Sequence, residues 1–287
     1  MGQRLRWYGL SFVSLILGLV SSAQAISTEF YVALDGLQTI TSGVYAGLAN
    51  PNAQRLTYLF AHPDPANPST NHFHAIGAYS YTGPASSPTI LSSNSNNRIP
   101  ETFTGQPPLP LVAGTGNQAG HLVSQAIPGL EYSDLTIASI QALAGFAPNT
   151  PEWFLFNSSG GRWISPLTEA EIALELVAIS PGLQLADSTG SVLLSQPGER
   201  YSLGAGDTLA FTPVFVVEAA TASAGSTYSA TLRLVDVSTA SGHVPFLESG
   251  TFNLDFVATP EPSTLALLSL GCGALAWLAR RRRLAGR

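Results

Sequence analysis

Four runs in the second half of the chain are rich in apolar residues, at 172–179, 207–217, 228–235 and 251–257. In the last two, large apolar residues alternate with small or polar ones. A period of two is typical of strands with one buried face, and turn residues such as Pro181-Gly182 and Pro197-Gly198 separate the runs. The spacing predicts an all-β fold, with an immunoglobulin-like or jelly-roll-like β-sandwich built from antiparallel strands over 166–259. A helix over 168–177, with Thr168 and Glu171 as a capping box, is the alternative for the first element.

The first half is less regular. We expect a β-rich region over 26–165, with strands at 30–34, 55–61 and 72–81. Residues 133–144 fit either an amphipathic helix or two short strands. The stretch 86–120 is rich in Ser, Asn, Pro and Gly and reads as a loop. Because so long a loop is unusual in a compact domain, we expect part of it to pair at a sheet edge.

The N-terminus has the three zones of a secretory signal peptide. Arg4 and Arg6 precede an apolar run over 10–20, and Ala23 and Ala25 form a small-residue cleavage site. The apolar run of eleven residues is too short to span a bilayer comfortably. We therefore predict that residues 1–25 are removed and that the mature chain begins at Ile26.

The C-terminus, 260–287, also has three parts. Pro260-Glu261-Pro262 is followed by an apolar stretch over 265–279 and by four consecutive Arg at 280–283. This order resembles the PEP-CTERM sorting signal of exported bacterial proteins. The resemblance implies an exosortase-type membrane enzyme as partner, cleavage near Pro-Glu-Pro, and transfer to the cell surface or its extracellular polysaccharide. The membrane is then contacted only through the C-terminal helix, before processing, with the Arg cluster on the cytoplasmic side.

The charge of the middle of the chain narrows the classes of function. Residues 26–259 hold five Arg and seventeen Asp and Glu, a formal net charge of −12, and the whole chain has no Lys. Such an acidic domain is not expected to bind nucleic acid. The only cysteine, Cys272, lies in the apolar tail, so no disulfide can staple the exported part.

Three of the five histidines fall within thirteen residues, at His62, His72 and His74. On a strand, His72 and His74 share a face, and His62 ends the preceding strand across a loop stiffened by prolines. Three imidazoles so placed are candidate zinc ligands, and copper or nickel fit the same ligand type. The fourth ligand would be Asp64, His121, His243 or water. We include His121 among the candidate ligands and interpret His243 as a residue without a metal.

A second resemblance concerns most of the exported chain. It rests on the segments 57–62, 71–84, 157–163, 174–177 and 246–252. They resemble a cyanobacterial family of PEP-CTERM proteins that the zinc uptake regulator represses. The resemblance implies expression under zinc starvation and a surface role in zinc binding or acquisition, with His62, His72 and His74 as the matching histidines.

Two other functions stay open from the sequence. A structural or adhesive matrix protein with an incidental His cluster fits the Ser-, Thr- and Gly-rich composition and the sorting tail. A zinc hydrolase would use the same histidines with Glu101 or Asp64 as base. The sequence has no Gly-x-Ser-x-Gly, His-Glu-x-x-His or P-loop motif. We therefore expect a zinc-binding protein of the cell surface used under zinc limitation for scavenging, storage or delivery, and no catalytic residues.

Overall fold

The computed structural model describes residues 28–259. The predicted signal peptide and sorting helix lie outside these residues. The described part is built mainly from β-strands, which confirms the all-β prediction. One short α-helix, α1 (Pro151–Phe156), starts at Thr150, whose side chain accepts a hydrogen bond from the Trp153 amide. Within 28–259, no helix has both the length and the apolar character needed to cross a membrane.

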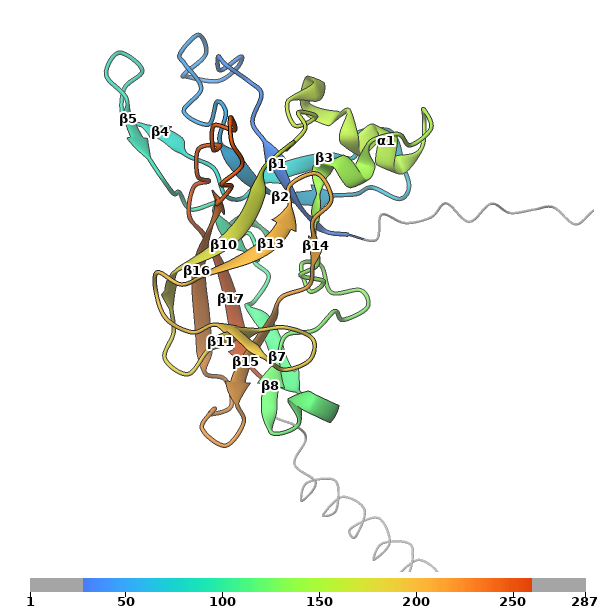
Figure 1. The fold of residues 1–287 in the computed structure, drawn as a ribbon, viewed down its shortest axis with the longest axis vertical. Helices are drawn as coiled ribbons and strands as arrows, with labels where there is room; N and C mark the ends of the chain where they lie inside the picture. Colours follow the sequence, from blue (N-terminus) through green and yellow to red (C-terminus); the bar gives the residue numbers. More distant parts are fainter. Residues whose placement is uncertain (1–27, 260–287) are drawn as a thin grey trace, which may run out of the picture.

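Two sheets and one hairpin make up the fold (Figure 1). The smaller sheet has the order β14 (Ala210–Phe211), β9 (Ile137–Ser139), β1 (Phe30–Leu34), β2 (Leu56–His62), β3 (His72–Ala75). The larger sheet has the order β12 (Val192–Leu194), β11 (Gln184–Ala186), β15 (Val214–Glu218), β8 (His121–Val123), β7 (Leu109–Ala113), β17 (Phe252–Ala258), β16 (Thr227–Asp236), β10 (Glu171–Ile179), β13 (Arg200–Ala205). Beside this path β6 (Arg98–Ile99) pairs with β17, and β4 (Ser80–Thr82) with β5 (Thr89–Leu91) forms the hairpin.

The pairing pattern departs from the sequence prediction in several places. Most pairs are antiparallel, but β1 with β9 and β17 with both β6 and β7 are parallel, so the sandwich is not purely antiparallel. Residues 171–179 form strand β10 rather than a helix, since the large sheet flanks them on both sides. The expected loop 86–120 supplies β5, an edge strand of the hairpin as predicted, and also β7, which lies inside the large sheet. Residues 133–144 become strand β9 followed by a 3-10 turn.

Strands β1 and β2 of the smaller sheet are buried on both faces. Every residue of β1, and every residue of β2 before His62, is buried. One face packs against the larger sheet through the main core, to which β1 and β2 contribute Phe30, Val32, Leu34, Leu56, Tyr58 and Phe60. The other face packs under the helical segment through a second core with Tyr31, Leu59, Phe73, Leu155 and Trp163. This layering explains why β1 and β2 are almost continuously apolar, whereas the later strands alternate.

The regions 26–165 and 166–259 share sheets and a core. Strand β14 from the second region extends the smaller sheet, while β7 and β8 from the first region lie within the larger sheet. Stacked rings cross the same boundary, since Tyr58 and Phe252 are parallel with centres 4.3 Å apart. The boundary at 165 therefore does not separate two packing units.

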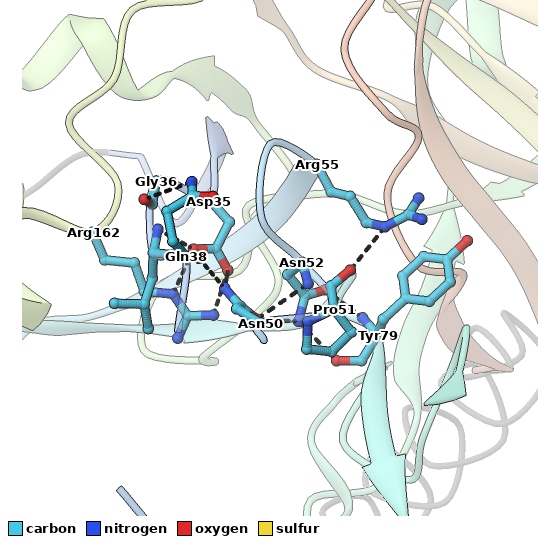
Figure 2. A network of polar contacts seen from close by, with 10 residues as sticks. Asp35, Gly36, Gln38, Asn50, Pro51, Asn52, Arg55, Tyr79 and Arg162 are labelled. Carbon is cyan, nitrogen blue, oxygen red and sulfur yellow. Dashed lines mark hydrogen bonds and ion pairs between the residues drawn. The ribbon is translucent and has the colours of Figure 1, made fainter. Parts of the chain in front are cut away.

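A buried polar network fixes the chain where β1 ends (Figure 2). The Asp35 carboxylate is fully buried and accepts hydrogen bonds from Arg162 Nε at 2.9 Å and Asn50 Nδ2 at 3.0 Å. Asn52 extends the network by exchanging two hydrogen bonds with the Tyr79 backbone. Arg55 lies with its guanidinium 4.1 Å from the centre of the Tyr79 ring. The network connects the turn before β2 to the segment after β3, and so holds the two strands that carry the histidine cluster.

Candidate metal centre

The β2–β3 pair brings three histidines together at one end of the smaller sheet. In the antiparallel register His62 lies opposite His72, and Phe60 lies opposite His74. Residues on one strand that are two apart share a face, so all three imidazoles lie on the Phe60 side. Phe73 points the other way into the second core. The structure thus gives His72, Phe73 and His74 the faces that the sequence predicts.

The three rings form a compact triangle. Ring centres are 5.1 Å apart for His62 and His72, 5.4 Å for His62 and His74, and 4.9 Å for His72 and His74. Imidazoles bound to one tetrahedral zinc through Nε2, at Zn–N near 2.1 Å, have centres about 5 Å apart. His72 is exposed and the His62 side chain is 45% exposed, so an ion could reach this triangle from solvent.

Hydrogen bonds determine which nitrogens of His72 and His74 are free. His72 Nδ1 lies 2.9 Å from the carbonyl oxygen of Thr70, and His74 Nδ1 lies 2.7 Å from Glu101 Oε2. Both partners are acceptors, so each neutral ring holds its proton on Nδ1 and presents a lone pair at Nε2. The two Nε2 atoms face each other at 3.0 Å. Two lone pairs this close repel unless a proton or a metal ion lies between them.

Glu101 holds His74 from the protein side. Its side chain is 4% exposed, and Oε2 accepts hydrogen bonds from both His74 Nδ1 and the Tyr132 hydroxyl. The hydrogen bond that His74 donates to this carboxylate raises the pKa of the His74 imidazole above its ordinary value, although partial burial acts in the opposite sense. A carboxylate on the distal nitrogen of a ligand histidine orients the ring and raises its basicity.

Glu131 approaches the triangle from another segment. Its Oε1 lies 3.8 Å from His62 Nε2, and its side chain is 44% exposed. The same segment lines a cavity of about 620 Å³, with apolar walls that include Phe60, Ile127 and Leu130. Glu29 also lines this cavity. Burial, together with the charges of Asp134 and Glu131, raises the pKa of Glu29 to about 7.

The other predicted ligands lie elsewhere or are already engaged. His121 is on β8, at the far end of the molecule from β3 (Figure 1), and lines a separate cavity of about 480 Å³. Asp64 caps its own loop, accepting from the backbone of Ala66 and Asn67 with one oxygen and from Thr70 with the other. His243 Nε2 lies 2.7 Å from Asp236 Oδ2. The structure brings together His62, His72 and His74, and it leaves His121 apart.

The ring spacing of the triangle resembles that of a zinc site, but its donor atoms are not placed as ligands. Over residues 28–259, no group of three or more His, Cys, Asp or Glu side chains is already arranged to hold a metal. The His72 and His74 Nε2 atoms are 3.0 Å apart, closer than the roughly 3.3 Å between ligand nitrogens on a tetrahedral zinc. Rotation of the exposed His72 side chain would widen that distance. The donor set, three imidazoles with carboxylates beside them, suits zinc.

The sequence pattern points to Glu101 only as a base for the hydrolase alternative, and it does not single out Glu131. Both arrive from irregular segments, because Glu101 precedes the short 3-10 turn 102–104 and Glu131 precedes Tyr132, a residue with φ of 68°. A buried tyrosine in the left-handed region marks a constrained site. The only indication of these two carboxylates in the sequence was the large excess of Asp and Glu over Arg in residues 26–259.

Comparison with known proteins identifies the C-terminal segment. Residues 258–283 match the PEP-CTERM protein-sorting motif. The motif indicates an exported protein that an exosortase sorts and that becomes associated with the cell surface, which confirms the predicted sorting signal and partner enzyme. Neither the curated proteins nor the solved structures include a significant match.

Proposed function

We propose that this exported protein binds zinc through His62, His72 and His74 at the cell surface, and that it serves under zinc limitation as a scavenger, reservoir or delivery protein. The observation that carries the proposal is the approach of the His72 and His74 Nε2 atoms to 3.0 Å, with both Nδ1 atoms bonded to acceptors. A proton or a metal ion between the two atoms would relieve the repulsion of their lone pairs, and His62 completes a triangle whose ring spacing matches that of a zinc site.

The surroundings support a metal cation rather than a shared proton alone. Two carboxylates lie beside the triangle, Glu101 at His74 and Glu131 at His62, and Glu29 and Asp134 line the cavity next to Glu131. The exported domain carries a net charge of −12, which raises the local concentration of cations. The resemblance to proteins repressed by the zinc uptake regulator supports zinc as the ion, and the sorting motif supports the cell surface as the place.

Calorimetric titration of the purified protein with zinc tests the proposal. The wild type should bind one zinc per chain at the triangle, and a triple His62→Ala, His72→Ala, His74→Ala variant should lose that binding. The matched control is His121→Ala, which removes an imidazole far from the triangle and should bind zinc as the wild type does. Equal binding by the wild type and the triple variant would overturn the proposal and favour a structural or adhesive matrix protein.

Copper and nickel are the competing ions, and competition with nickel tests the preference for zinc. Both ions accept imidazole ligands, and copper forms the stronger complexes in general. A zinc-dedicated carrier should keep its zinc when nickel is added in equimolar amount. Displacement of zinc by nickel would assign the triangle to nickel instead.

A further inference from the structure

Glu131 has a place beside the histidine triangle that neither the sequence pattern nor the sorting motif assigns. The carboxylate Oε1 lies 3.8 Å from His62 Nε2, on the nitrogen that is directed away from the ring's backbone attachment. Ligand atoms that share a tetrahedral zinc are about 3.3 Å apart, so the separation of the Glu131 and His62 side chains exceeds that of a ligand pair by about 0.5 Å.

The backbone around Glu131 is held independently of its side chain. Gln106 Nε2 donates to the carbonyl oxygen of Glu131 at 3.0 Å. The next residue, Tyr132, is buried and donates its hydroxyl to Glu101, the carboxylate that orients His74. Ser133 braces the preceding loop by hydrogen bonds to Ile127 and Leu130. Glu131 and Tyr132 therefore both adjoin the centre. Glu131 lies beside His62, and Tyr132 acts through its hydrogen bond to Glu101.

The geometry points to Glu131 as the fourth ligand of the centre, which would make it a closed site of three histidines and one glutamate. This inference rests on the proposed function, because it concerns the same ion. The other protein candidates for the fourth position are engaged or distant, as Asp64 caps its loop and His121 lies at the far end of the molecule.

Charge balance favours this assignment. A zinc ion carries two positive charges, and Glu131 bound to the ion together with Glu101 behind His74 would supply two negative charges. Neither carboxylate forms an ion pair with an arginine, and Arg98, the arginine nearest to Glu101 in the sequence, pairs with Asp255. A closed shell leaves no position for a metal-bound water, so the centre would hold and release zinc but would not perform the metal-hydroxide chemistry of a hydrolase.

Zinc affinity measured by competition with a chromogenic chelator tests the ligand. Glu131→Gln keeps the shape of the side chain and should weaken zinc binding at least tenfold, while the melting temperature without metal stays the same. Asp134→Asn is the matched control, since it removes one negative charge from the same segment and cavity. It should weaken binding less than threefold. An equal loss in both variants would reduce Glu131 to a distant charge and overturn the inference, as would unchanged affinity in Glu131→Gln.

Cobalt substitution gives a second readout. Azide binds to a cobalt ion that has an open or water-filled position and changes its visible spectrum. The cobalt-loaded wild type should not respond to azide, whereas Glu131→Gln should gain a response. An azide response of the wild type would overturn the closed shell and support the hydrolase alternative. If the wild type bound neither zinc nor cobalt, the proposed function would fail first and the inference would fail with it.

Discussion

The Tyr132 hydroxyl donates to Glu101 Oε2 over 3.0 Å, and the same oxygen lies 2.7 Å from His74 Nδ1. A buried tyrosine therefore positions the carboxylate that positions a candidate zinc ligand. The ring of Tyr132 packs against Phe60 with centres 4.4 Å apart, and Phe60 in turn contacts the edges of His62 and His74. The centre is thus anchored in the main core, although its histidines reach the surface.

Replacing Glu101 by Gln should weaken zinc binding. The amide keeps an acceptor near His74 but loses the negative charge that raises the basicity of the ring, so we expect the dissociation constant to rise by about 10- to 100-fold. Chelator competition measures this. Glu218→Gln, which changes an exposed carboxylate on β15, should leave the affinity unchanged. Equal affinity of Glu101→Gln and the wild type would show that Glu101 has no part in the centre.

Replacing Tyr132 by Phe should lower stability by about 1 kcal/mol, because one hydrogen bond to a buried carboxylate is lost while the ring packing remains. Urea unfolding measures this cost. Zinc affinity should fall less than in Glu101→Gln, since the carboxylate itself stays. Tyr45→Phe removes an exposed hydroxyl that bonds Gly83 and should alter neither quantity. If Tyr132→Phe weakened zinc binding more than Glu101→Gln does, Tyr132 would not act through Glu101 as proposed.

Local pattern was sufficient to predict the part of the centre that lies on strands. His72 and His74 are two residues apart, and His62 ends the neighbouring strand, so periodicity and a short connection placed all three on one face. Glu101 and Glu131 could not be found in this way. They lie 27 and 57 residues after His74 on segments without regular structure, and only the three-dimensional path of those segments brings them to the histidines.

Local pattern also predicted the all-β fold class, but it did not predict the order in which the strands pair. Buried and less buried residues alternate along β16 and β17, which indicates strands with one buried face and hence a sheet. This alternation does not indicate which strands pair with each other. The parallel pairing of β17 with β7 therefore cannot be predicted from the residues of either strand. Residues 109–113 read as a loop because two prolines flank Leu109, yet they form a strand in the middle of the large sheet.

Replacing Arg162 by Ala should destabilise the protein strongly. Asp35 is fully buried, and removal of its arginine leaves a carboxylate with only neutral donors, at a cost of about 3 kcal/mol. Arg98→Ala is the matched control, because Arg98 pairs with Asp255 at a more exposed position and should cost about 1 kcal/mol or less. Urea unfolding compares the two. Similar losses of stability in the two variants would indicate that the burial of Asp35 does not determine how much its ion pair with Arg162 stabilises the protein.

Glu175 should make stability depend on pH. Its carboxylate lies within the large sheet between Arg200 and Arg233. Burial alone would raise the pKa of Glu175, but hydrogen bonds from Arg233 and then Arg200 outweigh burial and hold the pKa below its ordinary value of 4.5. The unfolded chain therefore takes up this proton at a higher pH than the folded chain does. The stabilisation is complete above about pH 4.5 and is lost as the pH falls through the folded pKa.

The variant that isolates this effect is Glu175→Gln. At pH 7 it should be less stable than the wild type by about 2 kcal/mol, since hydrogen bonds to a charged group are lost. Below pH 4.5 the difference should shrink, because the wild-type carboxylate becomes protonated and resembles the amide. Urea unfolding of both proteins between pH 7 and pH 3 measures the difference and cancels the contributions of the other carboxylates. A difference that stays constant over this range would mean that Glu175 acts through packing and not through its charge.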